Sequence, residues 1–264
     1  MGRVIVLTSG KGGVGKSTST ANIGTALAIL GKKTVVVDAD VGLRNLDIIM
    51  GLESRVVYTS MDVIDGTCDM AKAMVKDRRV ENLSLLAASQ KNNKNDIQPE
   101  QMKKICTELK EEFDYVLIDS PAGIEQGFRN AAAGADEALI VTTPEVAAVR
   151  DADRIIGLLQ NMGIDNISLM INRLSPQMVK AGDMMTQQDV IEILAIDLLG
   201  VIPEDTEIVV STNRGLPLTQ SQGSIAGAAF KRVAQRLEGQ EVPIPEFKAE
   251  NWFEQLVNKL FNWG

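Results

Sequence analysis

The sequence of 264 residues contains no histidine and only two cysteines, and aromatic residues make up just 4% of it. Without histidine the chain cannot form a Ser-His-Asp or Cys-His nucleophile pair, nor an imidazole metal site. Cys68 and Cys106 are too far apart in the sequence for a CxxC redox or zinc motif. Zinc and iron–sulfur centres carried by one chain are therefore not expected, and the sparse cysteines favour a reducing compartment.

The chain also lacks an excess of positive charge and a long apolar segment. Its 27 lysines and arginines are outnumbered by 35 aspartates and glutamates, which gives a net charge of −8. This balance disfavours a generally basic nucleic-acid-binding surface. No apolar run reaches the roughly 20 residues that span a bilayer, and the N-terminal stretch lacks the pattern of a signal peptide. We therefore expect a cytoplasmic chain.

Short β-branched runs alternate with longer helical patterns along the sequence. The runs are continuously apolar, as is typical of strands covered on both faces. We expect strands at 3–8, 33–37, 83–86, 115–118, 138–142, 167–171 and 198–202, and helices near 16–31, 99–112, 125–133, 145–161, 187–194 and 222–238. This order predicts one α/β domain over residues 1–240, with a mostly parallel sheet flanked by helices on both faces.

The strongest motif is the segment from Gly10 to Ser17, which follows the first expected strand and fits G-x-x-x-x-G-K-[ST]. Glycines let the backbone wrap a phosphate chain, and the helix N-terminus that follows offers free N–H groups. Lys16 is placed to reach the β- and γ-phosphates, and the Ser17 hydroxyl suits a Mg²⁺ ion. The expected nucleotide-binding residues of the loop are Gly10, Lys11, Gly12, Gly13, Val14, Gly15, Lys16 and Ser17.

The same glycines also satisfy the dinucleotide fingerprint G-x-G-x-x-G, with an acid at Asp38 about the right distance further on. A dinucleotide loop has no use for Lys16 and Ser17, however, so these residues favour a triphosphate. In addition, the apolar run from Tyr115 ends in Asp119, as expected for the Mg²⁺-side carboxylate of a P-loop NTPase. We therefore predict a nucleoside triphosphate with Mg²⁺ rather than a nicotinamide cofactor.

The identity of the base is suggested by residues at two strand ends. The guanine-reading N-K-x-D motif of common GTPases is absent, which favours ATP over GTP. Asn172 and Arg173 end one expected strand where a base could be bound, and Pro203 and Glu204 end the next.

A second lysine, Lys11, stands at the start of the loop, where a chain with Lys16 has little need of it. The segment KGGVGKST from Lys11 to Thr18 resembles the deviant Walker A motif of the MinD/ParA family of ATPases. Other stretches that are similar to this family lie at 38–40, 42–47, 119–123, 143–154, 172–173 and 202–205. The resemblance extends over essentially the whole chain and implies a P-loop ATPase fold.

The resemblance also implies a role for each loop lysine and its neighbours. Lys16 would hold the β- and γ-phosphates, Ser17 the metal and Thr18 the α-phosphate side. Lys11 would reach across a dimer and neutralise transition-state charge at the partner's nucleotide, as an arginine finger does elsewhere. Hydrolysis is then expected to be slow in the monomer, which lacks this charge.

The same resemblance assigns roles to three aspartates. Asp40 would orient the attacking water, while Asp38 and Asp119 would support Mg²⁺ through its water shell. Independently of any family, a chain without histidine leaves carboxylates to position water. Asp38 and Asp40 stand two residues apart after a strand, so both are expected to face the same crevice, although a pair of solvated loop acids would look the same.

The C-terminal segment has its own pattern. A Pro-Ile-Pro connector within residues 241–250 precedes residues 251–264, where Asn251 and Glu254 form a capping box for an expected helix. At about 20 Å this helix is too short to cross a bilayer. It is expected to lie in a membrane interface or, alternatively, to be a last core helix. One face gathers its apolar side chains, the candidate membrane residues Trp252, Phe253, Leu256, Val257, Leu260, Phe261 and Trp263.

Taken together, these features predict a peripheral-membrane ATPase on the cytoplasmic side of the inner membrane. The resemblance implies that it forms an ATP-dependent homodimer and recruits a MinC-like division inhibitor to position the septum. It also implies that a MinE-like or other topological regulator acts on the protein and that hydrolysis releases it from the membrane. Asp151 and Asp153 would border the partner surface, although such a charged stretch is commonly just a solvated helix face. A ParA-type DNA segregation ATPase is the alternative, which the net charge opposes, so no nucleic acid is expected. A cluster-assembly carrier is disfavoured by the missing CxxC.

Overall fold

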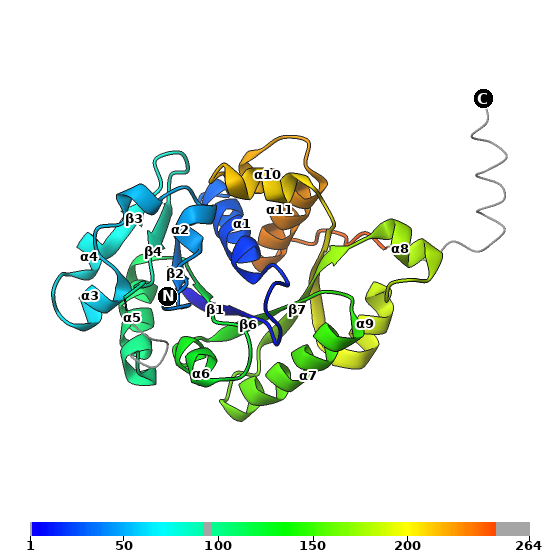
Figure 1. The fold of residues 1–264 in the computed structure, drawn as a ribbon, viewed down its shortest axis with the longest axis horizontal. Helices are drawn as coiled ribbons and strands as arrows, with labels where there is room; N and C mark the ends of the chain where they lie inside the picture. Colours follow the sequence, from blue (N-terminus) through cyan, green and yellow to red (C-terminus); the bar gives the residue numbers. More distant parts are fainter. Residues whose placement is uncertain (1, 92–96, 247–264) are drawn as a thin grey trace.

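The computed structural model describes residues 2–91 and 97–246, and in these ranges the strands form one sheet of eight with the order β3-β4-β2-β5-β1-β6-β7-β8 (Figure 1). All neighbouring strands run parallel except β3, which pairs antiparallel with β4. The predicted α/β class with a mostly parallel sheet is confirmed. The strands are β1 (Arg3–Thr8), β2 (Thr34–Asp38), β3 (Met74–Lys76), β4 (Leu83–Leu86), β5 (Tyr115–Asp119), β6 (Glu137–Thr142), β7 (Ile167–Leu174) and β8 (Asp197–Pro203).

Helices cover both faces of the sheet, because both faces of its strands are apolar. On one face the buried core includes side chains of α5, α6, α7, α8 and α9, and on the other it includes those of α1 and α11 (Figure 1). No helix in the described ranges is both long and apolar enough to cross a membrane. The helices are α1 (Lys16–Ile29), α2 (Leu46–Ile49), α3 (Ser60–Ile64), α4 (Met70–Ala73), α5 (Pro99–Glu112), α6 (Gln126–Ala132), α7 (Val146–Asn161), α8 (Pro176–Ala181), α9 (Gln187–Leu194), α10 (Glu207–Asn213) and α11 (Ile225–Leu237).

The expected strands and longer helices are present, with ends shifted by a few residues. The main difference lies in short elements that the sequence pattern did not predict: α2, α3, α4, α8, α10 and the antiparallel edge strand β3. These elements are too short to show a clear period of 3.6 or 2 residues. The expected membrane helix at 251–263 lies outside the described residues.

The position of β1 decides where the functional site forms. This strand lies between β5 and β6, with Leu7 opposite Asp119 on one side and Leu139 on the other. Because the neighbouring strands are parallel, the loops that follow all of them leave the sheet at the same edge. The loop after β1 therefore lies in the middle of this edge.

At the opposite edge of the sheet, a polar cluster fixes the end of α11. The Arg3 guanidinium binds the Glu137 carboxylate at 2.6 Å and lies 5.3 Å from the centre of the Tyr115 ring. It also donates to the carbonyl of Leu237 at 2.5 Å, and the Tyr115 hydroxyl donates to Glu238 at 2.7 Å. The hydrogen bond to Glu137 is the main reason that the pKa of Arg3 is raised. The last turn of α11 is thus tied to β1 and β5.

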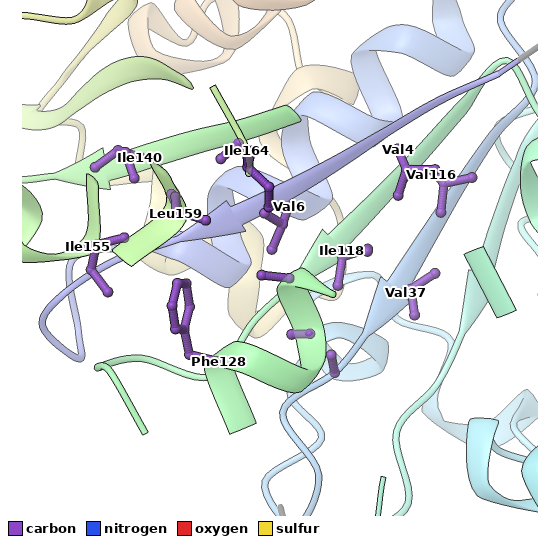
Figure 2. Close-up of a cluster of buried hydrophobic side chains, with 14 of the residues drawn as sticks. Val4, Val6, Val37, Val116, Ile118, Phe128, Ile140, Ile155, Leu159 and Ile164 are labelled. Carbon is purple, nitrogen blue, oxygen red and sulfur yellow. The ribbon is translucent and has the colours of Figure 1, made fainter. Parts of the chain in front are cut away.

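Phe128 of α6 provides a test of the core on the α5–α7 face. Figure 2 shows its ring near Ile155 and Leu159 of α7 and Val6 of β1, and the side chain is 1% exposed. Replacing Phe128 by Ala removes these contacts and leaves a cavity, so we expect the free energy of unfolding to fall by about 3–5 kcal/mol in urea titrations. In the control Val57→Ala the altered side chain is 79% exposed, and the change should stay within about 0.5 kcal/mol. Equal effects in the two variants would contradict this packing.

Candidate nucleotide-binding site

The loop after β1 has the geometry of a phosphate cradle. It ends at Gly15, whose φ of 92° lies in the left-handed region that favours glycine, and α1 begins at the next residue. A Cβ on Gly10 would lie 2.4 Å from the backbone oxygen of Asp151 in α7, so glycine is needed there for close packing. Gly12 and Gly13, in contrast, face open space. The loop is therefore packed against the protein at its ends and open in its middle.

Lys16 and Asp119 form the buried centre of the site. The Lys16 ammonium lies 2.9 Å from the Asp119 carboxylate, and both side chains are less than a tenth exposed. The Thr20 hydroxyl donates to the same oxygen at 3.3 Å. The structure thus brings together the two groups that the sequence placed at the start of α1 and the end of β5.

Asp38 lies beside Asp119, because these two residues are directly paired in the β2–β5 register. Its carboxylate accepts hydrogen bonds from the backbone N–H groups of Asp40, Asn45 and Leu46 at 3.0–3.2 Å. Burial first, and then the charge of Asp119, raises the pKa of Asp38 above its usual range. Asp38 therefore holds the loop that leads from β2 to α2. Asp40 in this loop is half-buried and lines the cavity that is described next.

A cavity of about 510 Å³ opens above the phosphate loop. One wall is the loop with Lys16, Ser17 and Thr18, the other is the Asp40 loop with α2, and Arg173 and Thr212 close a third side. Sequence reasoning missed the α2 wall and Thr212, because both come from short elements without a periodic pattern. The lining residues are Ser9, Gly12, Gly13, Gly15, Lys16, Ser17, Thr18, Asp40, Leu43, Asn45, Ile48, Ile49, Ala122, Arg173 and Thr212.

The candidate base-binding residues are found in different surroundings. The buried Asn172 amide donates to the carbonyl of Val14 at 2.7 Å, so this side chain supports the phosphate loop from behind. Arg173 lines the cavity, with a positive φ of 56°. Pro203 is buried at the end of β8 and Glu204 is exposed, and neither lines the cavity. A base-binding role for the four residues stays a prediction.

Lys11 is not among the residues that line the cavity of its own chain. Its side chain is 47% exposed, and its ammonium lies 3.6 Å from the Glu145 carboxylate, just before α7. On α7, Asp153 is exposed and Asp151 is half-buried, with its carboxylate 3.9 Å from Arg154. The Asp151 side chain thus lies near Arg154 on the helix surface, while its backbone carbonyl packs against Gly10. Its assignment to a partner surface stays a prediction.

The site consists of a glycine loop between the central strand β1 and helix α1, with Lys16 at the end of the loop and Asp119 at the end of the neighbouring strand β5. This arrangement defines a P-loop NTPase. Comparison with known proteins agrees. The ParA family, described as "NUBPL iron-transfer P-loop NTPase", matches residues 1–238. The chain is also 54% identical to the septum site-determining protein MinD of Synechocystis over 98% of this chain and 97% of that protein, and 50% identical to MinD of Bacillus subtilis over 95% and 94%.

Solved structures give the same result. The MinD chain of a MinC:MinD cell division protein complex from Aquifex aeolicus superimposes with a TM-score of 0.87 at 48% identity, covering 93% of this chain and 99% of that one. MinD from Pyrococcus horikoshii, complexed with Mg-ADP, gives a TM-score of 0.82 at 30% identity, covering 90% and 96%. The chain therefore belongs to the MinD family of septum site-determining ATPases within the ParA-type P-loop NTPases. The expected family and ATPase class are confirmed.

The role of Asn172 can be tested by changing its amide to a carboxylate. In Asn172→Asp the side chain can no longer donate to the Val14 carbonyl. A carboxylate oxygen then faces the carbonyl oxygen and repels it, so the loop should lose its shape. We expect at least tenfold weaker binding of both ATP and inorganic tripolyphosphate, measured by competition with a fluorescent nucleotide. Asn161→Asp, at the exposed end of α7, is the matched control and should bind normally. A loss for ATP alone would instead assign Asn172 to the base.

Proposed function

We propose that this chain is an ATP-dependent, dimerising, peripheral-membrane ATPase that positions the division septum by recruiting a division inhibitor and is released on hydrolysis. The observation that carries the proposal is the placement of Lys11. It lies at the start of the phosphate loop and is half exposed, yet it does not line the cavity of its own chain. A lysine in this place is available to the nucleotide of a second copy.

The residues of the site fit a nucleoside triphosphate and a divalent cation. The open Gly12–Gly13 backbone, the Lys16 ammonium and the Ser17 hydroxyl all face the cavity. Mg²⁺ prefers oxygen ligands and keeps several waters, so Ser17 would hold the ion directly while Asp38 and Asp119 would act through water. When bound, ATP supplies the phosphoryl group and Mg²⁺ neutralises its charge. Asp40 on the opposite wall is placed to orient a water molecule.

The surface around the cavity supports self-association. Leu43 and Ile48 line the cavity and are half or more exposed, at 57% and 50%. Ile124, two residues beyond the lining residue Ala122, is 48% exposed, and Val146, next to Glu145, is 67% exposed. Association of two cavity mouths would remove this apolar rim from water, at about 25 cal/mol for each Å² buried. The same approach would carry each Lys11 toward the partner's phosphates.

Dimerisation is tested with Asp40→Ala, which should slow hydrolysis and preserve the ATP complex. By size exclusion with light scattering, we expect a dimer with ATP and Mg²⁺ and a monomer with ADP. Adding Lys11→Ala should restore the monomer, because the charge supplied across the interface is lost. Lys33→Ala, an exposed lysine at the opposite edge of the sheet, should leave the dimer intact. A monomer in the presence of ATP would refute the proposed dimer.

Membrane attachment is proposed for the apolar face of residues 251–263, which lie outside the described part of the chain. From Lys248 onward, two lysines are balanced by two glutamates, so attraction to anionic lipid is small and binding rests on apolar insertion. One short helix binds weakly. Two such helices in a dimer make the second insertion intramolecular and raise the affinity about 100-fold. ATP-dependent dimerisation therefore controls attachment.

This link is tested by sedimentation with phosphatidylcholine vesicles, with and without phosphatidylglycerol. We expect pelleting with ATP but not with ADP, and only a small effect of the anionic lipid. Trp252→Glu places a charge on the apolar face and should abolish pelleting. Asn258→Glu adds the same charge to the polar face and should retain it. Equal pelleting with ADP and ATP would argue against control by the nucleotide.

The proposed partners follow from the family and from the surface of α7. The matched Aquifex chain is in a complex with MinC, which supports a MinC-like division inhibitor as partner. Asp153 on the exposed side of α7, and Asp151 beside it, are proposed to border this partner or a MinE-like regulator. The proposed location is the cytoplasmic side of the inner membrane, with no nucleic acid bound.

A further inference from the structure

Arg236 of α11 binds the linker that leads to residues 251–264, which we call the tail. Its guanidinium donates to the carbonyls of Val242 at 2.7 Å and Pro243 at 2.7 Å. It also donates to the carbonyl of Leu199 in β8 at 2.9 Å. A single planar group therefore joins two residues of the linker to a strand of the sheet, and we call these three contacts the Arg236 clamp.

The linker sequence explains why a side chain is needed. Strand β8 is the outermost strand of the sheet on one side, so an extended segment could pair with it through backbone hydrogen bonds. Pro243 and Pro245 have no N–H to donate, and the N–H of Val242 bonds locally to Gln240. Ile244 packs against the buried core on the α5–α7 face. The Arg236 clamp thus supplies the polar contact and Ile244 the apolar one.

The end of α11, which carries Arg236, is packed closely against the sheet. Helix α11 approaches β8 closely at Gly200, where a Cβ would lie 2.5 Å from Val233 and 3.4 Å from the Arg236 guanidinium. The end of α11 is held by Arg3, whose guanidinium donates to the Leu237 carbonyl, and by Tyr115, whose hydroxyl donates to the next residue, Glu238. Arg236 is one residue away from this anchor, so its guanidinium has a fixed position relative to the sheet.

We propose that Arg236 is a positioning residue for membrane attachment, which fixes the point at which the linker leaves the domain. This rests on the proposed function. With the clamp formed and Ile244 packed against the core, six residues, 245–250, separate Ile244 from residue 251. When the clamp opens and Ile244 leaves the core, the last contact of this segment with α11 is the hydrogen bond from the Gln240 N–H to the Gln235 carbonyl, and ten residues, 241–250, then precede residue 251. Effective concentration falls roughly as the −3/2 power of tether length, so lengthening this segment from six to ten residues lowers the dimer's vesicle affinity about twofold.

The clamp itself is tested without membranes, by limited digestion with a glutamate-specific protease. Glu241 is exposed and adjoins the clamped Val242, so cleavage there requires the linker to detach. We expect cleavage several times faster in Arg236→Ala than in the parent protein. Arg232→Ala removes the same charge one turn earlier on α11 and should not change the rate. Arg236→Lys keeps the charge but loses the planar fork, so it should also be cleaved faster. Equal rates in all four proteins would overturn the clamp.

The positioning role is then tested with the same variants and phosphatidylcholine vesicles in ATP. We expect about twofold weaker binding for Arg236→Ala and Arg236→Lys, while Arg232→Ala binds normally and dimerisation in solution is unchanged. Faster cleavage with unchanged vesicle affinity would overturn the positioning role and leave the clamp as a structural contact. If the parent protein does not bind vesicles, the proposed function fails while the digestion still tests the clamp.

Discussion

The contact between Lys16 and Asp119 joins the first helix to the central part of the sheet in a place shielded from water. Burying two charges carries a large desolvation penalty, which their mutual attraction offsets only when both are present. Loss of either partner leaves the other charge buried and costs roughly 3–5 kcal/mol. The position of Lys16 at the start of α1 and the stability of the domain's centre thus depend on the same interaction. The parallel order of β2, β5 and β1 makes it possible, because it sets the loop after β1 beside the end of β5.

Asp38 shows how the same centre shapes its surroundings. Its carboxylate faces that of Asp119 across two paired strands, an unfavourable arrangement for two negative charges. Three backbone N–H groups from the loop after β2 reduce this penalty. The loop is therefore folded over Asp38, and Asp40 reaches the cavity because of that fold. A residue expected to act only on the metal also determines the shape of one cavity wall.

The parts of the site that could be predicted from sequence are those encoded by contiguous or strand-terminal residues. The phosphate loop is one short segment, and Asp119 ends an apolar run, so position alone identified both. Thr212 and the α2 wall come from short elements that only tertiary packing brings to the cavity. Asn172 shows a different limit: its place at a strand end was apparent, but its orientation toward Val14 depends on how closely β7 approaches the loop.

The contact between Gly10 and Asp151 also bears on how a signal would arrive at the site. Gly10 of the phosphate loop packs directly against Asp151 of α7, where a Cβ on the glycine would lie 2.4 Å from the Asp151 carbonyl oxygen. A protein docked on the exposed side of α7 would therefore touch the element that supports the loop, close to Glu145 and Lys11. No relay of residues through the core is needed. Because glycine is required at position 10 by this close packing, α7 and the phosphate loop cannot be positioned independently of each other.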